Sequence, residues 1–363
     1  MCPYSLRMLL MGGDRIDEAV AHAARVLRTA VDRDWDVKAG GLDWSCLETA
    51  EHIAGDFVAY AGQLTGRATD GWVPFEVTLD EGTGPEGAIQ VIEATGRLLT
   101  ATVRTTPRGV RGFHPYPSGS ADATGFAAMG VTEVLLHTYD ICEALGVDAE
   151  PPAELCGAVL GHLFPHVPPT GGTPWQVLLW ATGRGELPGR ARLSSWRWHN
   201  SLSLPAGPLA LREVSPAAAA DLAAGGTGGL TWVEGGPFDG TRGASGKLAK
   251  AYADGVHRPG WGVYALVRTE DELAVGAMGF HGPPDDEGCV EVGYDLAEAA
   301  RGRGYATTAL RSLAEWALSR PEVTSLLARV DPGNTASEAV LARAGFTRLP
   351  DRDDTHVFGL RQS

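Results

Sequence analysis

One short glycine-rich stretch constrains this chain more than any other part of its sequence. Residues 301–306, with the sequence RGRGYA, lie between a strand-like run at 288–296 and a helix-like run at 305–318. A glycine-rich turn that opens a helix presents unpaired backbone N–H groups at the positive end of the helix dipole, where a pyrophosphate can bind. A dinucleotide fingerprint would need a third glycine where Thr307 stands, so a nicotinamide or flavin cofactor is disfavoured. In the simpler alternative, the glycines only make a turn before the helix.

Length, charge and cysteine content define the broad class of the protein. A chain of 363 residues is longer than one ordinary domain, so two domains are expected. Its formal charge of −15 disfavours a non-specific binder of nucleic acid or of an anionic membrane. Five cysteines without C-x-x-C spacing indicate reduced thiols. The apolar stretch at 6–11 is too short for a signal-peptide core, and no apolar run approaches membrane-spanning length, so we expect a cytoplasmic protein without nucleic-acid or membrane partners.

Four periodic apolar stretches in the first half predict amphipathic helices. They cover about 14–36, 45–66, 85–105 and 121–145, and Ser45 is the expected N-cap of the second. Four such helices joined by polar loops predict an all-α antiparallel four-helix bundle, a fold that can hold a metal between facing helices.

Polar residues lie at helical spacing inside this predicted bundle. The spacing puts Glu133, His137 and Asp140 on one face of the fourth helix, and His52 lies in the apolar centre of the second. A single buried histidine is more often a hydrogen-bonded core residue than a metal ligand, so for His52 alone both interpretations stay open.

Four short segments make the metal interpretation more specific. They are GGLDW at 40–44, EHIA at 51–54, TE at 132–133 and HTYD at 137–140. Together they resemble the DinB-like family of mycothiol-dependent maleylpyruvate isomerases, and later runs at 178–185 and 196–198 look like the tail of that family. The resemblance implies a DinB-like domain over 1–204, with a small extra segment after the four helices.

The same resemblance implies that His52, Glu133 and His137 bind one divalent metal, with zinc as the first choice. Two imidazoles and one carboxylate leave one ligand position open, as in catalytic zinc sites. Asp140, one turn beyond His137, would then orient a ligand or a substrate. The alternative is that these polar groups only fill a wet bundle core.

Three functions stay open for this half. As an enzyme, it would use the metal to activate a low-molecular-weight thiol such as mycothiol, in thiol transferase or isomerase chemistry. As a binding module, it would shield a metabolite or an antibiotic without reacting. As a dimerisation or docking element, it would serve the second half alone and make the protein a homodimer.

Two further motifs follow the glycine-rich turn. R-x-x-G-x-A at 301–306 is followed by DPGNTAS at 331–337 and by RAGF at 343–346. These segments resemble the acyl-CoA-binding core of the GNAT acetyltransferases, from about residue 209 to the C-terminus. Strands are expected at 209–214, 262–268, 272–280, 289–296, 324–330 and 356–360, and helices at 216–224, 247–256, 305–318 and 337–344. We therefore expect an α/β domain over 205–363, with 204–208 as the linker.

The GNAT resemblance also implies which residues bind acetyl-CoA. In that family the strand before the turn splays from its neighbour, and its free backbone groups bond the pantetheine arm. Backbone N–H groups of the turn hold the pyrophosphate, and a second element lies downstream. The matching residues here are Tyr294, Leu296, Arg301, Gly302, Arg303, Gly304, Tyr305, Ala306, Thr307 and Asn334, with Ser337 in the second element.

The chemistry expected of this half is acetyl transfer to an amine of a small molecule or peptide. Many family members have a tyrosine as the acid that protonates the leaving thiolate, but this chain has Leu341 there. Ser337 or a water is therefore the candidate donor. Glu291, beside the expected splay, is the candidate base, directly or through a water. Its alternative role is that of a solvated strand carboxylate.

Overall fold

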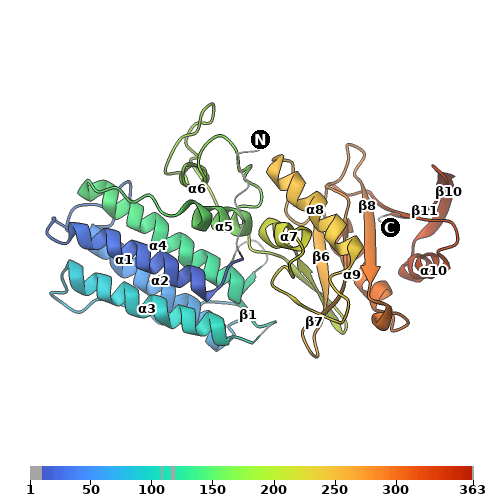
Figure 1. The fold of residues 1–363 in the computed structure, drawn as a ribbon, viewed down its shortest axis with the longest axis horizontal. Coiled ribbons are helices and arrows are strands. Elements are labelled where there is room, and N and C mark those ends of the chain that lie inside the picture. Colours follow the sequence, from blue (N-terminus) through green and yellow to red (C-terminus); the bar gives the residue numbers. More distant parts are fainter. Residues whose placement is uncertain (1–9, 108, 116–118, 362–363) are drawn as a thin grey trace. The chain divides into compact units, whose positions relative to one another are not determined.

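The computed structural model describes residues 10–107, 109–115 and 119–361 (Figure 1). The chain divides into two compact units, Met1–Asn200 and Ser201–Ser363, each with its own apolar core. Within the described ranges, no helix is both long and apolar enough to cross a membrane. Four cysteines are free thiols, and Cys2 lies outside the described residues, as does most of the 6–11 stretch.

Four long helices form most of the first unit. They are α1 (Gly13–Leu27), α2 (Cys46–Gly66), α3 (Pro85–Thr105) and α4 (Ala123–Leu145). Both α1 and α2 pack against α3 and α4, and Figure 1 shows the four running side by side in blue to green. Two shorter helices, α5 (Ala153–Leu163) and α6 (Pro174–Ala181), and a hairpin of β1 (Arg111–Phe113) and β2 (Ser120–Asp122) complete the unit. The prediction of a helical first half is confirmed, and its membership of the DinB-like family stays a prediction.

Capping side chains decide where these helices begin. The Ser45 hydroxyl accepts from the N–H of Glu48, and the Glu48 carboxylate accepts from the N–H of Ser45, so α2 starts at the predicted N-cap. The Asp122 carboxylate accepts from the N–H of Gly125 and starts α4. Gly146, in the left-handed region with φ 67°, ends α4 as predicted.

The first helix is shorter than the sequence predicts. It ends at Leu27 and is followed by one 3₁₀ turn, Arg28–Ala30, whereas the apolar pattern continues to about residue 36. The chain bends there because the Trp35 indole returns to the core and donates to the carbonyl of Ala30 at 2.9 Å. The apolar residues that prolong the pattern therefore belong to the turn that follows the helix.

The second unit is a mixed sheet with helices on both faces. Its described strands follow the order β10-β11-β9-β8-β7-β6-β4-β3, and β5 pairs with β7. The strands are β3 (Ser203–Ala206), β4 (Leu209–Glu213), β5 (Thr231–Trp232), β6 (Val263–Arg268), β7 (Leu273–Phe280), β8 (Cys289–Leu296), β9 (Ser325–Val330), β10 (Thr347–Arg352) and β11 (Thr355–Arg361). The helices are α7 (Pro216–Ala223), α8 (Asp239–Ala253), α9 (Tyr305–Leu318) and α10 (Thr335–Ala344).

The two faces of the sheet are covered by different helices. Val263, Ala265 and Val267 of β6 pack in one cluster with α7 and α8, and the alternate residues Tyr264 and Leu266 pack in another with α9. Every strand and helix that the sequence predicts in this half is present, although α8 begins at Asp239 and not at residue 247. Three strands, β3, β5 and β10, are additional.

The stretch predicted as a linker is part of the sheet. Residues 203–206 form β3, which pairs antiparallel with β4 from Ser203↔Arg212 to Ala206↔Leu209, and Gly207 makes the turn with φ 60°. Pro205 is tolerated because β3 is an edge strand, where a missing N–H costs no sheet hydrogen bond. The linker prediction at 204–208 is wrong because proline and glycine here mark a hairpin.

Candidate functional sites

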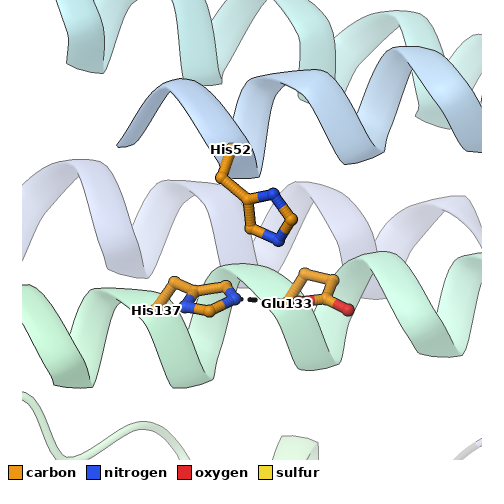
Figure 2. A group of neighbouring side chains, drawn as sticks. All are labelled: His52, Glu133 and His137. Carbon is orange, nitrogen blue, oxygen red and sulfur yellow. Dashed lines mark ion pairs between the residues drawn. The ribbon is translucent and has the colours of Figure 1, made fainter. Parts of the chain in front are cut away.

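Three side chains of the helical unit converge as a candidate metal centre. One ligand atom from each of His52, Glu133 and His137 lies within 4.8 Å of the other two. Figure 2 shows His52 reaching from α2 toward Glu133 and His137, which lie one turn apart on α4. The structure therefore brings together the three residues that the sequence resemblance selected.

Both nitrogens of His137 have a carboxylate partner. Nε2 lies 3.1 Å from Oε2 of Glu133, and Nδ1 lies 3.1 Å from Oδ2 of Asp140. Arg184, which follows α6, donates to both oxygens of Asp140, at 2.9 and 2.7 Å. A carboxylate on one ring nitrogen orients a histidine so that its other nitrogen is available to a metal. Sequence reasoning named Asp140 but missed Arg184, which is distant along the chain.

A second carboxylate, Asp56, lies beside the cluster on α2. Its Oδ2 is 3.2 Å from Nε2 of His52. Burial first, and then the charge of Glu133, raise the pKa of Asp56 well above its usual range. Sequence reasoning missed Asp56 although a signal was present, since His52 and Asp56 repeat on α2 the i,i+4 spacing of Glu133 and His137 on α4.

The electrostatics of this cluster suit a cation. Burial alone would lower the pKa of His137, but its contacts with Asp140 and Glu133 raise that pKa to about 9. Burial lowers the pKa of His52, and the charge of His137 adds to this effect. A positive charge is therefore favoured between buried carboxylates, and two imidazoles with one or two carboxylates form a donor set that zinc accepts. The described residues thus fit a divalent metal held by His52, Glu133 and His137, with Asp56 adjacent.

In the second unit, two neighbouring parallel strands separate. β8 pairs with β7 from Val292 to Leu296, but with β9 only from Cys289 to Glu291. In the described part of the chain, no strand pairs with the β9-facing edge of β8 beyond Glu291. Tyr294 and Leu296 lie on this part of β8, where a splay was expected. The carbonyl of Leu296 accepts from Nε of Arg301 at 3.3 Å. This backbone group, predicted to bond the pantetheine arm, is therefore already hydrogen-bonded within the chain.

The glycine-rich turn follows this separated strand after one 3₁₀ turn, Glu298–Ala300. Gly302 and Gly304 have φ 74° and 78°, and a Cβ at either would meet no atom within 4 Å. The turn therefore needs glycine for its backbone conformation and leaves the space beside the backbone open. Gly304 is the N-cap of α9, so the first N–H groups of this helix point out of its N-terminus.

The side chains around the turn divide between core and surface. Tyr305 and Ala306 are buried in the core and offer only their backbone to the turn. Arg303 is exposed, whereas Oγ1 of the buried Thr307 has no hydrogen-bond partner in the described structure. A cavity of about 730 Å³, lined in part by Phe238, Leu296 and Arg301, opens beside the turn.

The second predicted cofactor element is the N-terminus of α10. Oδ1 of Asn334 accepts from the N–H of Ser337 at 3.1 Å, so this side chain caps the helix. The carbonyl of Ser337 accepts from the hydroxyl of Tyr294 at 3.3 Å, which ties α10 to β8. Leu341 is fully buried in the apolar core. Ser337 is half-buried beside β8, and the roles of Asn334 and Ser337 toward a cofactor stay predictions.

Glu291 lies on the face of the sheet that α8 covers, opposite to the face covered by α9, and has two ion-pair partners. Its oxygens lie 3.1 Å from Nδ1 of His281 and 3.4 Å from Nε of Arg329. A second cavity, of about 520 Å³, is present on this face, between α8 and strands β6 to β8. His281 and Gly293 line this cavity, whereas Glu291 does not. Sequence reasoning selected Glu291 and missed His281, the residue directly after β7.

Comparisons with known proteins agree with the geometry of the second unit. The family model described as acetyltransferase (GNAT) domain matches residues 209–347. The uncharacterized N-acetyltransferase YjdG of Bacillus subtilis (strain 168) is 34% identical over 87 residues, which are 24% of this chain and 52% of that protein. The uncharacterized N-acetyltransferase p20 of Bacillus licheniformis is 27% identical over 85 residues, 23% of this chain and 48% of that protein. The chain thus spans about half the length of these curated relatives.

Among solved structures, an acetyltransferase from Agrobacterium tumefaciens str. C58 is 28% identical, with a TM-score of 0.32. The match covers 48% of this chain and 100% of that one. The family match extends from the start of β4 to the start of β10 and includes the separated strands and the glycine-rich turn. Residues 209–347 therefore form a GNAT acetyltransferase domain.

Proposed function

We propose that the protein is an acetyl-CoA-dependent N-acetyltransferase that acts on a primary amine of a small molecule or peptide. The observation that carries this proposal is that β8 stops pairing with β9 after Glu291 and is followed, after one 3₁₀ turn, by the left-handed glycines that open α9. The acidic charge and the scattered cysteines favour a cytoplasmic location.

The backbone supplies most of the binding. The open N–H groups at the start of α9 would hold the pyrophosphate, with Arg303 adding charge. The free edge of β8 near Tyr294 would bond the pantetheine arm. Acetyl transfer then needs a neutral amine, an oriented thioester and a proton for the leaving thiolate.

The candidate proton donor is Ser337 or a water. Leu341 cannot serve, because its side chain is apolar and fully buried. Ser337 lies in the first turn of α10, and its carbonyl accepts from the hydroxyl of Tyr294, which holds it near the free edge of β8.

Calorimetry with acetyl-CoA tests this function. Wild-type protein is expected to bind acetyl-CoA, and Gly304→Val to lose binding, because a branched side chain would fill the open space at the turn. Gly225→Val is the matched control, since Gly225 also has a positive φ and open space around it but lies after α7. Undiminished affinity in Gly304→Val would show that the cofactor site is elsewhere.

For the helical unit we propose a second function, metal-dependent thiol transferase or isomerase chemistry. It is favoured by the convergence of His52, Glu133 and His137 and by the chain of contacts from His137 through Asp140 to Arg184. A divalent cation held there would lower the pKa of a bound thiol, such as mycothiol, or of a bound water. Asp140 and Arg184 fix the ring of His137, and Tyr60 donates to Oε1 of Glu133 at 3.3 Å and holds that carboxylate.

Metal analysis separates this function from a binding or dimerisation role. After zinc reloading and dialysis, plasma mass spectrometry is expected to find about one zinc per chain. A folded wild-type protein that binds acetyl-CoA but stays metal-free would reduce the helical unit to a scaffold or a docking element.

A further inference from the structure

His281 and Glu291 form a side-chain pair on the face of the sheet that α8 covers. The N–H of His281 donates to the carbonyl of Glu291 at 2.9 Å, which continues the β7–β8 ladder by one step beyond Phe280↔Val292. The two residues are therefore direct cross-strand neighbours. Their side chains meet as well, because Nδ1 of His281 lies 3.1 Å from Oε1 of Glu291.

The other ring nitrogen of His281 lies over the strand that separates from β9. A Cβ added at Gly293 would approach Nε2 of His281 to 2.9 Å. The pairing of β8 with β9 ends at Glu291, and Gly293 is the second residue after it. Both His281 and Gly293 line the cavity of about 520 Å³. Nε2 thus lies beside the backbone of β8 at the splay, on the face opposite α9.

We propose that His281 is the catalytic base of the acetyltransferase and that Glu291 is its positioning residue. This step rests on the proposed acetyl-CoA-dependent function. The Nδ1–H of His281 donates to Glu291, which leaves the lone pair of Nε2 directed to the cavity.

The proposed step moves two protons and exchanges one bond. Nε2 of His281 takes the first proton from the alkylammonium group of the acceptor, and the neutral nitrogen attacks the thioester carbon. A C–N bond forms and the C–S bond breaks. The attacking nitrogen loses its second proton, which reaches the leaving thiolate through the Ser337 hydroxyl or a water, and His281 then releases the first proton to solvent.

The cavity limits the class of acceptor. Ala244, Leu248, Val263 and Ala277 give it an apolar wall between α8 and the sheet. An amine attached to an apolar body fits this wall. The acceptor is therefore a primary alkylamine whose carbon chain carries an apolar group.

The other charged groups at this cavity are less suited to be the base. Asp295 is occupied, because it accepts from the N–H and hydroxyl of Thr241 and from the N–H of Ala277. Burial lowers the pKa of His257 to about 4 and makes it a weak base. Lys247 and Arg258 are cations, and Arg329 contacts the second oxygen of Glu291 from β9.

The first test needs no acceptor. Nitrogen-15 NMR of histidine-labelled protein, with His281 assigned through His281→Gln, is expected to show neutral His281 protonated at Nδ1. Glu291→Leu is expected to move the proton toward Nε2. A wild-type His281 protonated at Nε2 would overturn the proposal. Calorimetry with acetyl-CoA on the same sample reports separately on the proposed function, so the two failures are distinguishable.

The second test is kinetic and uses 2-phenylethylamine as the probe amine, with release of CoA as the readout. At pH 7, His281→Ala is expected to lower kcat/KM by about 100-fold or more, with unchanged affinity for acetyl-CoA. Glu291→Gln is expected to cost less than His281→Ala, because the imidazole base remains and loses only a positioning partner. His356→Ala is the matched control, because His356 also pairs with a glutamate, Glu338, outside the cavity. A larger loss in Glu291→Gln than in His281→Ala would make Glu291 the base.

Discussion

The candidate metal centre consists of side chains, whereas the candidate acetyl-CoA site consists mostly of backbone groups. In the helical unit, two of the four long helices bring His52, Glu133 and His137 together, and each of them would act on a metal through the donor atom of its side chain. In the sheet unit, the site before and at the start of α9 is mostly backbone, namely an unpaired strand edge and a turn of glycines. The difference implies that substitutions of single side chains should abolish function at the first site but only weaken it at the second, unless they change the backbone.

The largest expected effect is at His137. His137→Ala should reduce zinc content from about one to almost none per chain. Only His52 and Glu133 would remain as ligands, and two protein ligands hold zinc poorly. His22→Ala is the control, because His22 is also a buried histidine but lies on α1 outside the cluster. Plasma mass spectrometry after reloading measures both, and circular dichroism checks the fold. Full zinc content in His137→Ala would remove the metal centre from this place.

The next effect tests whether the contacts of Arg184 with Asp140, which in turn contacts His137, contribute to zinc affinity. Arg184→Gln should weaken zinc binding about 10- to 100-fold, because Asp140 would lose two hydrogen bonds and hold His137 less firmly. Arg190→Gln serves for comparison, as Arg190 stacks on Trp180 in the same stretch of chain. Competition with a chromogenic chelator gives the affinities. Equal affinities for the two variants would mean that His137 is oriented without Arg184.

In the sheet unit, the ranking of two hydroxyl variants tests the proton donor. Ser337→Ala should lower kcat about tenfold, whereas Tyr305→Phe should change it little because Tyr305 is buried in the core. Steady-state rates with saturating acetyl-CoA and 2-phenylethylamine give the comparison. The reverse ranking would move the donor away from α10.

The smallest effect is expected at an exposed charge of the turn. Arg303→Ala should weaken acetyl-CoA binding only about twofold to fivefold, since exposed ion pairs contribute little and the N–H groups of α9 remain. Gly304→Val, in the same turn, should abolish binding. Calorimetry on both variants decides between backbone and side-chain recognition, and a collapse of affinity in Arg303→Ala would favour the side chain.

Local patterns in the sequence predicted much of this molecule correctly. β8 and α9 have the expected bounds, and α2 begins at the expected cap, because strand alternation, helical periodicity and capping depend on near neighbours in the chain. The same locality misled at two places. Pro205 and Gly207 suggested a linker where they make an edge hairpin, and the apolar residues after Leu27 suggested a longer helix where Trp35 folds back.

What the sequence determined by itself is therefore most of the long helices and strands, the glycine-rich turn and the three polar residues of the candidate metal centre. Only the tertiary structure decided which groups from other segments surround them: Arg184 beside Asp140, and His281 opposite Glu291. The physical reason is that such contacts join segments far apart in sequence, as with Arg184 and Asp140, and depend on how helices pack and on the register between strands. Neither the packing nor the register is visible in the spacing of residues along one segment.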